Sequence, residues 1–200
     1  MREFILRARK GPTTPEFSLG AARRPGFLEI VAHTVVNTLF TAKNIRTGTV
    51  MQIVLDGPSA PPKTVRFESD NLCSLGGFDE ASILGVLQRA LREGRSLALE
   101  EEAQVDDGLF VAKRSFEKLI RDRSAADTLY YLQPSGTDLR DEALALPATF
   151  VFTDHLSMPK KSDKFLERLG ARPLSVGPRT LFASQCVVLV HNELDRRGFD

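Results

Sequence analysis

Short apolar segments rich in β-branched residues alternate with amphipathic helical segments along almost the whole chain of 200 residues. The segment 149–153 is almost wholly apolar, as expected of a strand that is buried on both faces. Between 28 and 42, apolar residues recur at intervals of three and four, which predicts an amphipathic helix. This alternation predicts an α/β fold, with a mainly parallel sheet flanked by helices.

The same two periodicities predict the remaining elements. We expect strands at 3–9, 50–55, 64–67, 109–112, 129–132, 149–153 and 174–176, and helices at 28–42, 83–91, 115–121, 160–169 and 182–196. The last segment is ambiguous because 187–190 has strand propensity, but its length and the apolar line Ala183, Cys186, Val190 and Leu194 favour a helix. Since no internal repeat is visible and the length is typical of one domain, residues 1–200 are expected to form a single domain.

The composition excludes several classes of protein. With 42% hydrophobic and 26% charged residues, the chain is typical of a globular protein rather than a disordered one. No apolar run approaches the roughly 18 residues of a membrane span, and the N-terminus lacks the long apolar stretch of a signal peptide, so we expect a cytoplasmic protein. Cys73 and Cys186 form no CxxC pair and the histidines have no ligand spacing, so no metal site is expected.

Basic residues concentrate near the two ends of the chain, although the net charge is only +1. Residues 1–24 carry Arg2, Arg7, Arg9, Lys10, Arg23 and Arg24 against Glu3 and Glu16. The residues after 154 are also net positive, and the middle of the chain is acidic. If the fold brings the two ends together, they form one positive face for a nucleic acid, but a solvated surface without a partner gives the same pattern.

Three loops in the last third of the chain are candidates for a ligand site. Ligands of parallel α/β sheets bind at loops that follow the carboxyl ends of strands. The loops 133–136, 154–157 and 177–180 follow predicted strands and contain glycine, proline or small polar residues, which let a ligand approach the backbone closely. Plain turns would have a similar composition, so the loops indicate a site without identifying its chemistry.

Familiar catalytic motifs are absent, since the chain contains no GxGxxG, P-loop, GxSxG or HExxH sequence. Asp154 and His155 follow a buried strand and provide acid–base groups, although neighbouring side chains on a loop usually diverge. Cys186 lies in an apolar segment, where a cysteine is more typical of packing than of catalysis. The residues alone therefore predict a C-terminal ligand site in an α/β protein.

Several segments are recognisable as a set. They are MREFILRARK at the N-terminus, YYLQPSG (Tyr130–Gly136), FTDHLS (Phe152–Ser157), LERLGARPLSVGP (Leu166–Pro178) and CVVLVHNELDRR (Cys186–Arg197). Together they resemble the archaeal tRNA pseudouridine N1-methyltransferases, which belong to the SPOUT methyltransferases and have bacterial relatives. The resemblance covers nearly the whole chain and is strongest over 130–197, where the order of LGAR, SxGP and VHNELD is specific.

The resemblance implies an S-adenosylmethionine-dependent methyltransferase that acts on RNA, at N1 of a pseudouridine in tRNA. It also implies a deep C-terminal trefoil knot at about 128–197, a homodimer, and a cofactor pocket built by three loops of the knot. The matching pocket residues are Leu132, Thr153, Leu174, Ser175, Val176, Gly177, Pro178 and Cys186. Asp154 is the candidate base, and we expect the apolar line on the last helix to face the second protomer.

The RNA contact is expected at the most positive segment of the chain. Its candidate residues are Arg7, Arg9, Lys10, Arg23 and Arg24. Elsewhere the chain departs from the archaeal pattern, with Thr153 in place of a glycine, Phe27 and Ala81 in place of arginines, and Phe182 and Gln185 in place of histidines. These departures leave a non-catalytic RNA-binding protein with the same knotted fold as the alternative, and a small-molecule enzyme that binds a phosphate as a third interpretation.

Overall fold

The computed structural model describes residues 1–19, 27–72 and 75–199. Its strands are β1 (Arg2–Ala8), β2 (Thr49–Leu55), β3 (Lys63–Glu68), β4 (Glu102–Asp106), β5 (Leu109–Ala112), β6 (Thr128–Asp138), β7 (Ala148–Thr153) and β8 (Arg172–Ser175). Its helices are α1 (Leu28–Leu39), α2 (Glu80–Glu93), α3 (Phe116–Ser124), α4 (Lys160–Arg168) and α5 (Ala183–Arg196), with short 3-10 turns at Ser69–Asn71 and Gly94–Ser96. None of the described helices is long and apolar enough to cross a membrane.

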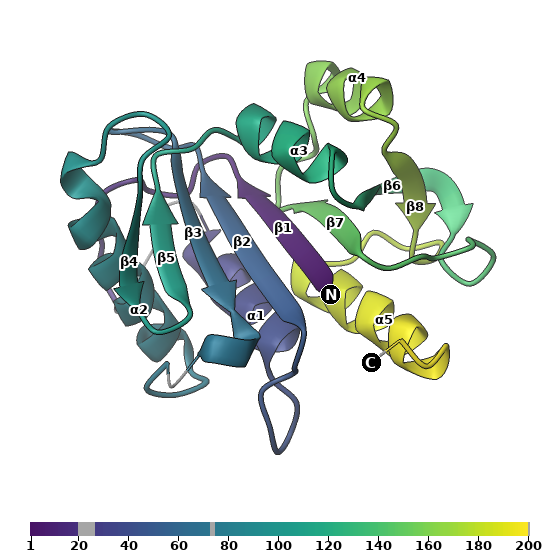
Figure 1. Ribbon diagram of the computed structural model, residues 1–200, viewed down its shortest axis with the longest axis horizontal. Coiled ribbons are helices and arrows are strands. Elements are labelled where there is room, and N and C mark those ends of the chain that lie inside the picture. Colours follow the sequence, from purple (N-terminus) through teal and green to yellow (C-terminus); the bar gives the residue numbers. More distant parts are fainter. Residues whose placement is uncertain (20–26, 73–74, 200) are drawn as a thin grey trace.

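The strands form one eight-stranded sheet in the order β4-β5-β3-β2-β1-β7-β6-β8 (Figure 1). Parallel pairs join β2, β1, β7, β6 and β8, whereas β3, β5 and β4 pair antiparallel. The predicted α/β fold is therefore confirmed, but the sheet is mixed rather than mainly parallel. The connections from β2 to β3 and from β4 to β5 are too short for the crossover that a parallel pair needs.

The sequence patterns do not predict β4, because the stretch around it reads as an acidic surface segment. The structure explains why: β4 is an edge strand whose residues are exposed or half-buried, so it has no buried apolar face. The turn that joins it to β5 contains Gly108, whose φ of 69° lies in the left-handed region. Elsewhere the expected helices and strands are present, with boundaries shifted by a few residues.

The sheet separates two layers of helices. On one face, α1, α2 and α5 cover a core that includes Phe4 and Leu6 of the central strand β1. On the other face, α3 and α4 cover a core that includes Ile5 (Figure 1). All three β1 side chains are fully buried, because successive residues of a strand point to opposite faces and helices cover both faces here.

The strand β6 is longer than the sequence predicts and irregular in its middle. The sequence pattern ends it at Leu132, but Leu174 of β8 pairs with both Leu132 and Thr137, so the residues between them bulge out and pairing then resumes. At Gly136 a Cβ atom would lie 2.5 Å from the backbone nitrogen of Leu174. The close approach of β8 therefore requires glycine at this position.

Helix α5 is confirmed, but its apolar line has a different partner from the one expected. Ala183, Cys186, Val190 and Leu194 are all buried within the same chain, in the core that α1 and the sheet share. The expectation that this line needs a second protomer is wrong. An amphipathic helix can bury its apolar face against the sheet of its own chain or against a second protomer. Sequence periodicity does not distinguish these two cases.

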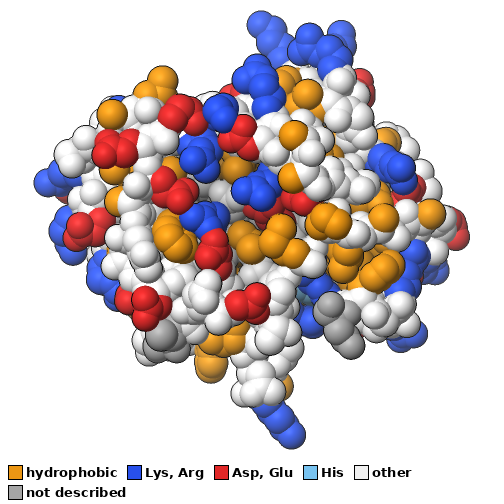
Figure 2. Space-filling view, in the orientation of Figure 1, with side chains coloured by type: hydrophobic (Ala, Val, Ile, Leu, Met, Phe, Trp, Pro, Cys, Tyr) orange, Lys and Arg blue, Asp and Glu red, His pale blue; other side chains and the backbone are white. Residues whose placement is uncertain are grey.

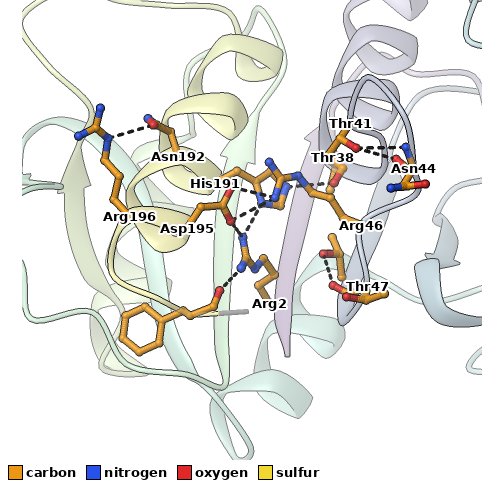
Figure 3. A network of polar contacts seen from close by, with 12 residues as sticks. Arg2, Thr38, Thr41, Asn44, Arg46, Thr47, His191, Asn192, Asp195 and Arg196 are labelled. Atoms are coloured by element: carbon orange, nitrogen blue, oxygen red, sulfur yellow. Dashed lines mark hydrogen bonds and ion pairs between the residues drawn. The ribbon is translucent and has the colours of Figure 1, made fainter.

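A buried polar network fixes α5 against α1 and β1 (Figure 3). Arg2 donates from Nη1 to Nδ1 of His191 at 3.1 Å and to Oδ1 of Asp195 at 2.7 Å, and its Nη2 donates to the Phe199 carbonyl. His191 donates from Nε2 to the Thr38 carbonyl at 3.0 Å. Since Nδ1 must accept, the imidazole is neutral. Burial and the nearby Arg46 and Arg2 guanidinium groups lower the pKa of His191 to about 3.

This network predicts a pH-dependent loss of stability. The pKa of His191 is about 3 in the folded chain and 6.5 ordinarily, so below pH 6.5 the unfolded chain binds a proton that the folded chain does not. The free energy of unfolding should therefore decrease as the pH is lowered below 6.5, by up to about 2 kcal/mol at pH 5. We expect His191→Gln to be about 1–3 kcal/mol less stable at pH 7 but to lose less than the parent on acidification. Urea unfolding at pH 7 and pH 5 measures both, and equal declines would contradict the assignment.

Candidate functional site

A cavity of about 430 Å³ lies beside the bulge of β6, where β7 and β8 end and α5 begins. The structure places around it every residue expected to bind the cofactor, which are Leu132, Thr153, Leu174, Ser175, Val176, Gly177, Pro178 and Cys186, together with Asp154. The three strands are neighbours in the sheet and run parallel, so the bulge of β6 lies close to the carboxyl ends of β7 and β8. These segments therefore converge although they lie far apart in the sequence.

One wall of the cavity is apolar and rigid. Phe152, Leu174 and Ala183 line it and are almost fully buried. Cys186 lies beside them with its sulfur 3.9 Å from the Leu181 carbonyl, and burial raises the pKa of its thiol to about 11. The thiol is therefore protonated at neutral pH and contributes packing rather than a nucleophile.

Asp154 adds a carboxylate to the cavity, and its side chain is fully buried there. Its Oδ1 accepts a hydrogen bond from the Leu156 amide at 2.9 Å. Its Oδ2 has no hydrogen-bond partner among the described residues and lies 3.7 Å from Nδ1 of His155, which is likewise unpartnered. Burial raises the pKa of Asp154. A buried acceptor without a partner is uncommon in folded proteins and is typical of a functional position.

A second carboxylate at the cavity was not expected from the sequence. Asp163 lines the cavity from the first turn of α4, and burial together with the neighbouring Glu167 raises its pKa. The sequence signal that could have identified it is its place at the start of the helix that follows the Asp154 loop. Two acidic groups thus line a cavity whose other residues are a mixture of apolar and polar side chains, with Arg179 as a basic member.

The loop after β8 exposes its backbone to the cavity. Gly177 has a φ of 133°, and a Cβ atom built on it would meet no described heavy atom within 4 Å. Its amide donates to the Ser175 hydroxyl at 3.3 Å, which holds the loop in this shape. A glycine here leaves open space in which a ligand can approach the main chain.

The donor set fits S-adenosylmethionine. Apolar walls with accessible backbone suit a purine ring, and the carboxylates of Asp154 and Asp163 suit the positive charges of the sulfonium and amino groups. Within the ranges that the structure describes, no group of three or more His, Cys, Asp or Glu side chains could hold a metal ion. The cavity therefore offers sites for an organic cation.

The basic residues expected to bind RNA fall into three groups. Arg7 is 12% exposed and already engaged, since it pairs with Asp56 at 2.9 Å, donates to Ser162 at 2.8 Å and lies over the Phe116 ring. Arg9 is half-buried and Lys10 is exposed. Arg23 and Arg24 lie outside the described residues. The structure thus leaves Arg9 and Lys10 as the described cations of this set that are open to a ligand.

Arg9 connects the cofactor cavity to a second hollow. With Arg7, Asp56, Pro61, Pro62 and Ser115 it lines a hollow of about 480 Å³. Its Nη1 donates to the carbonyl of Ser157 at 3.4 Å, and Ser157 itself lines the cofactor cavity. A ligand that spans both hollows would therefore pass the Arg9 guanidinium.

Helix α4 carries part of the positive charge that the sequence places after residue 154. Figure 2 shows Lys and Arg side chains gathered at the top of the view, over α4. The exposed basic residues of this helix are Lys160, Lys161, Lys164 and Arg168. Because Met158 and Asp163 line the cofactor cavity, the helix lies at its rim.

Comparisons with known proteins agree with this geometry. A protein-family profile described as "Putative SAM-dependent RNA methyltransferase" matches residues 1–199. A relative from Shewanella baltica, named "Putative pseudouridine methyltransferase", is 42% identical over 195 residues, which cover 98% of each chain. A relative of the same name from Vibrio atlanticus is 40% identical over 199 residues and the full length of both chains.

A solved structure shares the fold at low sequence identity. It is Nep1 of Archaeoglobus fulgidus bound to S-adenosylhomocysteine, which aligns with a TM-score of 0.63 and 9% identity over 98% of this chain and 97% of the other. At this identity the likeness supports the arrangement of the sheet and helices.

The cavity predicts opposite effects for two substitutions. Gly177→Val should weaken S-adenosylmethionine binding by more than about 100-fold, because a branched side chain would project where the cofactor approaches and because its φ disfavours such a residue. Thr153→Gly should leave binding unchanged or tighten it, because it removes bulk from the cavity wall. Titration calorimetry measures both dissociation constants.

Gly48→Val provides the matched control. Gly48 has a φ of 61° and equally open surroundings, but it does not line the cavity. Its replacement should strain the fold without changing cofactor affinity. If Gly177→Val binds S-adenosylmethionine normally, the cofactor site lies elsewhere. If the parent protein does not bind the cofactor but the Thr153→Gly variant does, the non-catalytic alternative is favoured.

Proposed function

The chain belongs to the family of SAM-dependent RNA methyltransferases that matches residues 1–199, and from this premise we propose that it methylates N1 of a pseudouridine in tRNA. Its cofactor is S-adenosylmethionine. The pseudouridine assignment is supported by the names of relatives that are about 40% identical over the full chain. The observation that carries the proposal is the convergence of the β6 bulge and the ends of β7 and β8 on one cavity, beside a buried carboxylate oxygen without a hydrogen-bond partner among the described residues.

The chemistry divides simply between cofactor and protein. S-adenosylmethionine supplies a methyl group on a positively charged sulfur, and that charge is lost when the methyl group leaves. Phe152 and Leu174 give the cavity an apolar wall against which the cofactor can pack. The bulge of β6 and the loops after β7 and β8 orient the ligand, and such positioning supplies much of the rate in a transfer between two bound groups.

Asp154 has the properties of the base. N1 of the target must lose its proton as the new N–C bond forms, and Oδ2 of Asp154 is the free acceptor at the cavity. Because burial raises the pKa of this carboxyl group, its anion is a stronger proton acceptor than an exposed aspartate. The Leu156 amide holds the carboxylate in place by donating to Oδ1 at 2.9 Å, and Nδ1 of His155 lies 3.7 Å from the free Oδ2.

We propose a single domain over 1–200, with the deep trefoil knot of SPOUT methyltransferases at about 128–197. The continuous sheet that joins both halves of the chain supports one domain, and the resemblance of residues 130–197 to SPOUT methyltransferases supports the knot. A crystal structure would contradict the knot if the segment 174–182 followed an unthreaded path. A cytoplasmic location follows from the tRNA substrate, and cell fractionation tests it.

A homodimer is also part of the proposal, through a surface other than the buried apolar line of α5. Three apolar side chains lie on the outward side of α5 or just before it. They are Phe182, Val188 and Leu189, which are 62%, 46% and 37% exposed. A second copy that covers these side chains would place its own residues beside the cofactor cavity, which α5 lines through Ala183 and Cys186. Sedimentation velocity should give twice the chain mass of 22.1 kDa, and a monomer at micromolar concentration would contradict the dimer.

The proposed reaction predicts a defined product. Unmodified tRNA carrying pseudouridine, incubated with the protein and S-adenosylmethionine, should yield N1-methylpseudouridine in nucleoside mass spectrometry. Asp154→Asn should reduce the rate by about 100-fold or more, because a general base of this kind contributes about 10²–10⁴. Cofactor affinity should fall by much less than the rate, because Asp163 still provides a carboxylate at the cavity. If the parent binds tRNA but forms no methylated nucleoside, the protein is the non-catalytic RNA-binding alternative.

The proposed RNA surface predicts a salt-dependent fall in affinity. Replacing Arg9 and Lys10 with alanine should weaken tRNA binding and reduce the slope of log affinity against log salt by about 0.7–0.9 for each phosphate that is no longer neutralised. S-adenosylmethionine affinity should not change. The control replaces Lys43 and Arg92, which are exposed and line neither hollow. Equal effects of the two double variants would show that only net charge matters.

A further inference from the structure

Phe27 is an exposed aromatic residue held in an unusual backbone conformation. It precedes α1 with φ 56° and ψ 47°, in the left-handed region that bulky residues rarely adopt. Its side chain is 45% exposed, whereas Leu28, the next residue, is almost fully buried in the core. The buried Leu28 thus anchors the backbone while the Phe27 ring faces outward. Left-handed backbone conformations of bulky residues concentrate at functional positions.

The Phe27 ring lies against the wall of the cofactor cavity. Its centroid is 3.6 Å from that of the His155 ring, and the two planes are inclined by 37°. His155 lines the cavity, and its Nδ1 lies 3.7 Å from Oδ2 of Asp154. Phe27, His155 and Asp154 therefore form a continuous path from the molecular surface to the unpartnered carboxylate oxygen.

This arrangement differs from that of another exposed phenylalanine in the chain. Phe78 is 66% exposed and packs edge-on against Phe40, and neither residue lines the cavity. Phe27 instead pairs with a cavity residue and leaves part of its ring accessible to solvent. Proteins that bind single-stranded RNA use accessible aromatic rings of this kind as platforms on which bases stack.

We propose that Phe27, supported by His155, stacks on the unpaired base adjacent to the target nucleotide. The inference rests on the proposed RNA methylation at this site. It adds a residue that orients the RNA strand as the target nucleotide enters the cavity. The target base must lie near Oδ2 of Asp154, so the next base along the strand reaches the outer end of the same path. Phe27 is therefore a positioning residue that contributes to RNA binding, whereas Asp154 accepts the N1 proton of the target base.

The proposal predicts a change in KM rather than in kcat. Phe27→Ala should raise the KM for tRNA about 10-fold and leave kcat and the affinity for S-adenosylmethionine within about twofold of the parent. Phe27→Tyr should retain the parent KM because it keeps the ring. The matched control, Phe78→Ala, removes a ring that is even more exposed and should change neither constant.

A fluorescence measurement tests the same stacking without relying on turnover. The chain contains two tyrosines and no tryptophan, so Phe27→Trp introduces a single tryptophan, which can be excited selectively, at the proposed platform. With S-adenosylhomocysteine present, unmodified tRNA should quench its emission saturably, and an RNA fragment with an abasic site next to the target pseudouridine should quench it less. Phe78→Trp should respond to neither RNA.

The outcomes separate this proposal from the proposed function. If the parent methylates tRNA but Phe27→Ala keeps the parent KM and Phe27→Trp is not quenched, the platform is wrong and the methyltransferase assignment stands. If quenching occurs without any methylated product, the platform is supported and the methylation assignment fails. A rise in KM that Phe27→Tyr shares with Phe27→Ala would also contradict stacking.

Discussion

The burial of β1 on both faces is the constraint on which the rest of the molecule depends. The strand lies in the middle of the sheet and carries Arg2 and Glu3, which are 5% and 1% exposed and point to opposite faces. Each buried charge needs partners, and each obtains them from distant segments. Arg2 binds His191 and Asp195 of α5, and Glu3 contacts Thr149 of β7 and Arg123 of α3.

These contacts connect the interior of the fold to the cavity. Arg2 holds α5 close to α1 and β1, and the first turn of α5 lies beside the β6 bulge and the ends of β7 and β8, where Ala183 and Cys186 close one wall. The opposite wall contains Asp154, whose burial both raises its pKa and leaves Oδ2 without a partner among the described residues. The apolar wall of the cavity and the raised pKa of Asp154 thus have one physical origin, which is the burial of side chains around the central strands.

Much of the architecture could be predicted because it depends on short-range patterns. Apolar periodicity identified most helices and strands, and local signals identified where some of them begin and end. Asp79 caps α2 by accepting from the Ser82 amide, and Gly170, with a φ of 78°, follows the end of α4. The edge strand β4 and the continuation of β6 to Asp138 were missed, because their pairing depends on partners from other parts of the chain.

The amino-acid sequence by itself determined the α/β class, the three loops of the candidate site and the family, since these follow from local periodicity and from motifs in a specific order. Only the tertiary structure decided what each side chain does. It paired Arg7 with Asp56, buried the apolar line of α5 within its own chain, and placed the Phe27 ring on His155. The physical reason is that burial and pairing depend on residues far apart in the sequence, whose proximity exists only once the sheet has formed.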